Sequence, residues 1–265
     1  MAKTLSAIRG IVRQFLRDEY TGNTYEFADD ELDLHISEAL EDISKRRPYG
    51  VKEIVYASNK SGTATATTAN HLIDTVNAQF VAGDVGKTVY NSTDKTTAKV
   101  TEYNSESDLT LDTDIMASGE SYTLYCYGGT NGRDLNISSI TGLIGEKVEK
   151  AEYPTRQWPR DKKDVEVFGD IVTLKVDSEP ADGDEVFLYC HKVHQLTESA
   201  STLTADLEKV LVDGAVALTA RSWLNNMRDQ IVPNTVNWYH KWANEHYTIY
   251  QKGLDSITPA KAWKF

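Results

Sequence analysis

Residues 5–20, LSAIRGIVRQFLRDEY, and residues 27–49, FADDELDLHISEALEDISKRRPY, decide the fold of the first part of the chain. Apolar side chains recur at helical spacing in both, at Leu5, Ile8, Val12, Phe15 and Leu16 and then at Leu32, Ile36, Ala39, Leu40 and Ile43. Asp29 is the expected N-cap of the second helix, and Pro48 stops it. Helices over residues 4–20 and 29–47 are therefore predicted, and their short connection favours packing as a hairpin.

Acidic residues are concentrated in this hairpin. Between Asp18 and Ser44 there are ten Asp or Glu residues and no Lys or Arg. The whole chain carries a formal net charge of -12, which disfavours a protein that grips nucleic acid, because duplex affinity comes mainly from Lys and Arg that neutralise phosphates. A surface past which DNA slides is compatible with this charge. We expect the acids to face a DNA channel or a basic neighbour.

The composition indicates a folded soluble protein of one elaborated domain or two small ones. The chain has 265 residues, of which 40% are hydrophobic and 26% charged. Its N-terminal segment lacks the apolar region of a signal peptide, and no apolar run is long enough to span a bilayer. The two cysteines, Cys126 and Cys190, lie in strand-like runs, so buried free thiols in a protein that folds in the cytoplasm are expected.

The middle of the chain changes from helical spacing to the period of a β-strand. Residues 51–56 alternate in this way directly after Pro48. Residues 58–130 then hold fourteen Thr and no Pro, in short β-like runs separated by Gly, Asn and Asp. This pattern predicts a small antiparallel barrel or sandwich, inserted between the helical hairpin and the rest of the chain.

A second β-rich region is expected from Leu135 to Leu196, with an irregular loop from Pro154 to Asp164. Leu109–Cys126 resembles Val172–Cys190, since both patterns read as a strand, an acidic turn that ends in Gly, and a strand. Two hairpins with the same turn chemistry explain the resemblance, and a duplicated unit is the alternative.

The last 60 residues return to helix. Thr204 is the expected N-cap of a stripe formed by Leu207, Val210, Leu211, Gly214, Ala217, Leu218 and Leu224, and a final helix runs from Pro233 to about Gly253. The predicted fold class is α+β. Residues 1–57 and 131–265 form a helical frame with β-hairpins, and residues 58–130 form an inserted β-module.

No pattern in the sequence predicts catalysis, a cofactor or a metal ion. His191 and His194 follow Cys190, but residues three apart on a strand point to opposite faces and do not converge on a metal. Asp112 and Asp114 lack the rest of a calcium loop, and the glycine-rich run at residues 128–132 lacks the helix and Lys of a phosphate-binding loop. A protein that is not an enzyme is expected.

The C-terminal segment, residues 259–265, is the one candidate partner-binding site. Its sequence is PAKAWKF, and Pro259, Trp263 and Phe265 are the residues expected to bind, because aromatic side chains anchor segments in partner pockets. Four of the five Trp residues lie after residue 220. Docking into a neighbouring protein, packing on the chain's own domain and disorder are the three alternatives for this tail.

Residues 73–125 resemble a small β-module that recurs in phage virion proteins. The resemblance depends on the 74–80 lead-in, the Asp84-Val85-Gly86 turn, Tyr90-Asn91 and the Leu109-Thr110-Leu111 strand before Gly119-Glu120. These are turn and strand-packing features, so they imply architecture and no chemistry.

The order of the segments is similar to that of the head-to-tail adaptor family of tailed double-stranded DNA phages. The resemblance covers residues 5–57 and 134–255. It depends on four segments in this order: IRGIVRQFLRDE, FADDELDLHISEALEDI, a β middle and LTADLEKVLVDGAVALTARSWL. It implies a virion protein of the neck, made in the host cytoplasm, without cofactor and not bound to a membrane. A ring of twelve copies would bind beneath the portal protein and receive the tail or its completion proteins, while DNA passes without specific binding.

Two other functions fit the sequence less well. A tail-completion or head-closure ring protein belongs to the same structural class. An adhesion or carbohydrate-binding protein built on the β-module belongs to a different class. Such a protein would display aromatic residues on the module, but residues 58–130 contain no Trp.

Overall fold

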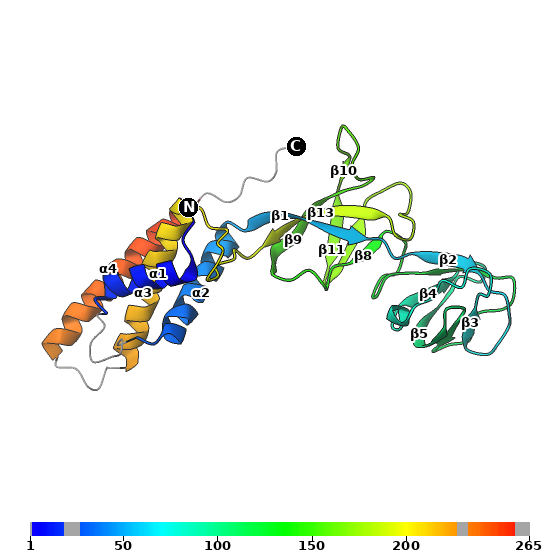
Figure 1. The fold of residues 1–265 in the computed structure, drawn as a ribbon, viewed down its shortest axis with the longest axis horizontal. Helices are drawn as coiled ribbons and strands as arrows, with labels where there is room; N and C mark the ends of the chain where they lie inside the picture. The colour runs from blue at the N-terminus through cyan, green and yellow to red at the C-terminus, as the bar shows by residue number, and fades with distance from the viewer. Residues whose placement is uncertain (1, 19–26, 227–232, 258–265) are drawn as a thin grey trace. The chain divides into compact units, whose positions relative to one another are not determined.

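The computed structural model describes residues 2–18, 27–226 and 233–257. Over these residues the chain is α+β, with four α-helices and several antiparallel sheets, as the sequence predicts (Figure 1). The chain divides into two compact units. The helical unit comprises Met1–Gly50, Gly142–Gly145 and His191–Phe265, and the β unit comprises Val51–Thr141 and Glu146–Cys190.

The helical unit is a bundle built from both ends of the chain. Its helices are α1 (Leu5–Leu16), α2 (Asp29–Arg46), α3 (Ala205–Asn226) and α4 (Pro233–Ser256), which lie side by side (Figure 1). One core joins them, and its members include Ile8, Val12, Leu32, Ile36, Ala39, Ile43, Leu207, Leu211, Ala215, Tyr250 and Leu254. No helix of the described residues is long and apolar enough to cross a membrane.

The helix ends of the hairpin differ in detail from the prediction. Helix α1 ends at Leu16, short of the expected Tyr20, because Arg17 adopts a left-handed conformation with φ of 55°. Helix α2 begins at Asp29, but its N-cap is Ala28, whose side chain makes no capping hydrogen bond. The Asp29 carboxylate instead accepts a hydrogen bond at 2.6 Å from the Arg13 guanidinium of α1.

The acids of the hairpin have basic partners on the preceding helix. Arg9 forms an ion pair with Asp33 at 2.7 Å. Arg13 is buried, and its guanidinium binds both Asp18 and Asp29. The hydrogen bond from Arg13 is the main cause that lowers the pKa of Asp29. Three of the ten acids, Asp18, Asp29 and Asp33, therefore have cationic partners on α1, which lies outside the counted segment.

Two sheets of the β unit come mostly from the second β-rich region. The four-stranded sheet has the order β1 (Tyr49–Tyr56), β13 (Glu185–Lys192), β9 (Leu143–Glu152) and β10 (Lys162–Lys163). The three-stranded sheet has the order β11 (Val165–Phe168), β12 (Ile171–Leu174) and β8 (Asp134–Asn136). Strand β13 is buried continuously from Val186 to Cys190, as expected for a central strand with both faces covered.

Residues 58–130 form a third sheet, of six strands. Its order is β2 (Lys60–Thr63), β7 (Ser121–Leu124), β4 (Thr88–Asn91), β5 (Thr96–Ser105), β6 (Asp108–Leu111) and β3 (His71–Ile73), with the short helix η1 (Ala82–Asp84) between β3 and β4. The Ala64 amide donates to the Glu120 carbonyl at 2.9 Å, and the Thr65 amide donates to the Ile73 carbonyl at 2.7 Å. These bonds join both edges, so the sheet curls on itself.

The two compact units divide the chain at other positions than the predicted domains. Residues 146–190 belong to the β unit with the six-stranded sheet, whereas the sequence assigned them to the helical frame. Buried Asn59, just before β2, helps to hold the β unit together. Its side-chain amide donates to the Gly132 carbonyl at 2.6 Å and to the Pro180 carbonyl at 2.9 Å, so it ties the β-module to two loops of the second β-rich region.

The two segments predicted as similar hairpins are not hairpins. Strands β5 and β4 lie between β6 and β7, and β12 and β13 belong to different sheets. The turn chemistry was nevertheless predicted correctly, because Gly119 and Gly183 have φ values of 90° and 81°, a backbone region that favours glycine. A local turn determines where a strand ends, but it does not determine which strand pairs with it.

Candidate functional site

The three residues that the sequence nominates for partner binding, Pro259, Trp263 and Phe265, lie outside the described residues. Their role in binding therefore stays a prediction. The described residues offer other surfaces.

The histidines beside Cys190 do not converge on a metal position. His194 is buried, and its ring nitrogens lie 2.9 Å from the Arg47 carbonyl and 3.1 Å from the Thr202 hydroxyl. Burial lowers its pKa, although these contacts oppose the shift. Within residues 2–18, 27–226 and 233–257, no three His, Cys, Asp or Glu side chains gather where they could hold a metal ion.

Both cysteines are free and buried, as predicted. Burial is the main cause that raises the pKa of Cys126 to about 11, and the reactive species is the thiolate. We expect a disulfide reagent such as DTNB at pH 8 to modify neither thiol in the folded protein and both in guanidinium. Rapid modification of one thiol in the folded protein would contradict this arrangement.

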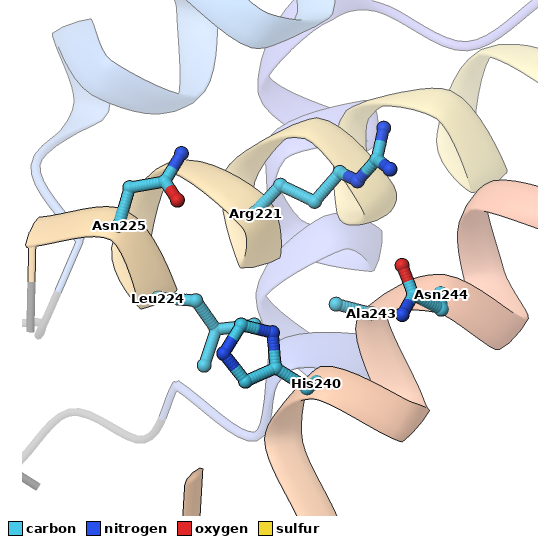
Figure 2. Close-up of a pocket in the computed structure, with 6 residues that line it drawn as sticks. All are labelled: Arg221, Leu224, Asn225, His240, Ala243 and Asn244. Carbon is cyan, nitrogen blue, oxygen red and sulfur yellow. The ribbon is translucent and has the colours of Figure 1, made fainter. Parts of the chain in front are cut away.

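A groove of about 340 Å³ lies between the last turns of α3 and the middle of α4 (Figure 2). Its lining residues are Arg221, Leu224, Asn225, His240, Ala243 and Asn244. Leu224 and Ala243 are buried and form an apolar floor, while the four polar residues are exposed and surround it. None of the described residues that line the groove is a carboxylate, although the chain as a whole is acidic.

The polar side chains of this groove form few interactions within the described part of the chain. Arg221 stacks on the Tyr247 ring, with its guanidinium carbon 3.7 Å from the ring centroid. Among the described residues, neither Arg221 nor His240 forms a hydrogen bond or an ion pair, and the same holds for the Asn225 and Asn244 side chains. Stacking fixes the position of a cation and leaves its N–H donors available to an acceptor from outside.

The floor of the groove is part of a small core that holds α3 and α4 together. Ala220, Leu224 and Ala243 form this core, and Trp223 and Trp242 pack against it. These contacts join the two helices beneath the groove.

Helix α2 presents a second candidate surface, in which an exposed leucine is flanked by acids. Leu34 is 57% exposed. Asp30 and Glu38 lie four residues before and after it, and both are exposed. Residues four apart share a helix face, so the apolar side chain sits between two carboxylates. We call Asp30, Leu34 and Glu38 the Leu34 face.

The β unit displays two exposed aromatic residues. Trp158 lies in the loop between β9 and β10, and Phe168 lies at the end of β11; each is 89% exposed. The Trp158 loop is held in place by Arg156, whose guanidinium makes two hydrogen bonds to the Glu185 carboxylate at 3.0 and 2.8 Å.

No known protein family and no curated protein sequence matches the chain.

The groove between α3 and α4 was not predicted from the sequence. Its cation and its histidine are 19 positions apart on different helices, so no short motif links Arg221 to His240. A weak signal was available, because residues 215–244 contain a single acid, Asp229, in a chain with 40 acids.

Proposed function

We propose that the protein is a structural component of a tailed phage virion, a head-to-tail adaptor that forms a ring between portal and tail. The observation that carries the proposal is the helical unit. The N-terminal hairpin and the two C-terminal helices share one core, and the β-rich segment is inserted between them. This is the order of elements on which the resemblance to the adaptor family depends.

The surfaces of the helical unit support ring formation. A closed ring needs two different surfaces on each copy, which meet head to tail. The groove and the Leu34 face are two such surfaces: the described residues that line the groove include no acid, whereas the Leu34 face is acidic. A net charge of -12 also suits a ring through which DNA passes, because the chain as a whole repels phosphate.

The proposal is tested by negative-stain electron microscopy and mass photometry of the purified protein, alone and mixed with portal rings encoded in the same genome. We expect rings, with twelve copies as the implied number, stacked coaxially on the portal. A chain that stays monomeric from micromolar to millimolar concentration and does not bind the portal would overturn the proposal. Stacking on the tail side of a preformed portal–adaptor complex would favour a head-closure or tail-completion protein.

The predicted role of the tail is tested in the same mixtures. A chain that ends at Ile257 lacks Pro259, Trp263 and Phe265. If these residues anchor the adaptor to the portal, the shortened chain will still form rings but will bind portal rings at least ~10-fold more weakly. Equal binding by both chains would remove the tail from the portal interface. A full-length Trp263→Ala variant separates loss of the aromatic anchor from loss of chain length.

Carbohydrate binding is a second candidate, and exposed Trp158 in the β unit favours it. Sugar rings stack on exposed aromatic side chains, and Trp158 lies in a loop whose Arg156 makes two hydrogen bonds to the Glu185 carboxylate. Binding of the wild-type protein to an immobilised glycan array, lost in Trp158→Ala, would support this function over the adaptor.

A further inference from the structure

We propose that the groove between α3 and α4 binds the Leu34 face of helix α2 from the next copy in the ring. The inference rests on the proposed function and names the interface that closes the ring. Leu34 would enter the groove, and Asp30 and Glu38 would meet its polar rim.

The chemistry of the groove fits an apolar side chain that is flanked by carboxylates. Its floor, Leu224 and Ala243, is apolar and buried. Its rim offers the donors of a guanidinium, two amides and an imidazole, which the described residues do not use (Figure 2). Arg221 in particular presents a planar fork that suits a carboxylate.

The Leu34 face has the complementary chemistry. Leu34 is more than half exposed, while its neighbours on α2 that face the bundle, Leu32 and Ile36, are almost wholly buried. Asp30 forms no ion pair with any of the described residues, and Glu38 contacts only His35, at 2.9 Å. The fold therefore leaves the leucine exposed, and among the described residues the Asp30 carboxylate accepts a hydrogen bond only from the adjacent Glu31 amide, at 3.1 Å.

A second copy is the occupant that these observations favour. Helix α2 packs into its own bundle through Leu32 and Ile36, and Leu34 points outward. The groove of the same copy therefore does not receive Leu34. A surface complementary to a pocket elsewhere on the same molecule produces a head-to-tail contact, which a ring requires. DNA is disfavoured as the occupant, because Arg221 is the one permanent cation among the described residues that line the groove, and the floor is apolar.

Two single substitutions disrupt one half of the interface each. Leu34→Asp puts a third acid on the face, and Arg221→Glu puts an acid into the groove. We expect each variant alone to lose the ring and to raise the dissociation constant between copies by on the order of 100-fold, because each buries a charge without a partner. Sedimentation velocity and mass photometry measure the oligomeric state, and circular dichroism confirms that each variant is folded.

Mixing the two variants is the decisive experiment. The Leu34→Asp copy retains an intact groove, and the Arg221→Glu copy retains an intact Leu34 face. Together they can form one good interface and no more, so an equimolar mixture should give 1:1 heterodimers where each variant alone is monomeric. A misfolded variant could not complement its partner, so recovery of the dimer excludes misfolding as the cause of ring loss.

Matched controls make the same chemical changes elsewhere on the helical unit. Ile249→Asp replaces an exposed apolar residue of α4, and Lys252→Glu reverses an exposed charge of the same helix. Both should form rings like the wild type.

The possible results separate the inference from the proposed function. Rings that persist in Leu34→Asp and Arg221→Glu overturn the inference and leave the adaptor function standing. Monomeric variants that do not pair at concentrations far above the wild-type dissociation constant also overturn it. A wild-type chain that never assembles overturns both. Rescue of Arg221→Glu by a portal or tail protein, and not by Leu34→Asp, would assign the groove to that partner.

Discussion

Asp84→Ala is expected to lower the free energy of unfolding of the β unit by about 3–5 kcal/mol, because it removes one partner from a buried ionic cluster. The Asp84 carboxylate is fully buried. Its oxygens accept hydrogen bonds at 2.7 Å from the ammonium groups of Lys60 and Lys87, and at 2.9 Å from the Val81 amide. Both lysine side chains are nearly buried, so the variant leaves two cations in the curled sheet without their carboxylate.

The same cluster makes the stability of the β unit depend on pH. Burial alone would raise the pKa of Asp84, but the hydrogen bonds from Lys60, Lys87 and Val81 hold it below its ordinary value. A carboxyl whose pKa is lower in the folded state stabilises the fold above its unfolded pKa of about 4. That contribution is lost as the pH falls through the folded pKa. The stability difference between wild type and Asp84→Ala should therefore be full at pH 7 and shrink below about pH 4.

Amide hydrogen exchange of the β unit across a urea series, at pH 7 and at pH 3, measures both effects. Glu102→Ala is the matched control, since it removes an exposed carboxylate of β5 in the same sheet and should change stability by less than about 0.5 kcal/mol. An Asp84→Ala protein that unfolds at the same urea concentration as Glu102→Ala would show that the cluster adds nothing to stability.

Local patterns predicted the helices well, because their signals lie within a few residues of one another. The apolar spacing of Leu32, Ile36 and Ile43 predicted both the helix α2 and its buried face, which the structure confirms. The fold class followed from the order of such segments. Turn glycines such as Gly119 were also predicted, since φ above zero favours glycine.

Long-range pairing could not be predicted, because the partners share no local signal. In the sequence Asp84 belongs to a turn, yet in the structure its carboxylate is buried and binds Lys60, which lies 24 residues earlier. The predicted pairing of β6 with β7 was wrong for the same reason. The sequence showed the acids of the Leu34 face but not the exposure of Leu34. The groove could not be predicted, because it forms only where α3 and α4 pack together. The contact of Asn59 with Gly132, 73 residues later in the chain, likewise has no local signal.

Gly214→Ala is expected to destabilise the helical unit by about 2 kcal/mol, although alanine ordinarily favours a helix by about 1 kcal/mol over glycine. A Cβ atom at residue 214 would lie 2.6 Å from Cε2 of Tyr250 and 2.9 Å from the Ala39 Cβ. Neither neighbour can yield easily. Tyr250 is buried and its hydroxyl donates to Asp42 at 3.0 Å, and Ala39 belongs to the core of α2.

Gly10→Ala is the matched control, and the two substitutions should have opposite signs. A Cβ at residue 10 of α1 meets nothing within 4 Å, so the alanine there gains helix propensity without a clash and should stabilise by about 0.5–1 kcal/mol. Urea denaturation followed at 222 nm measures both. The crossing at Gly214 also sets how α2 lies against α3, and hence the spacing of the Leu34 face and the groove. Gly214→Ala should therefore weaken ring assembly even at temperatures where it remains folded, whereas a variant that is destabilised but assembles normally would separate the helix crossing from the interface.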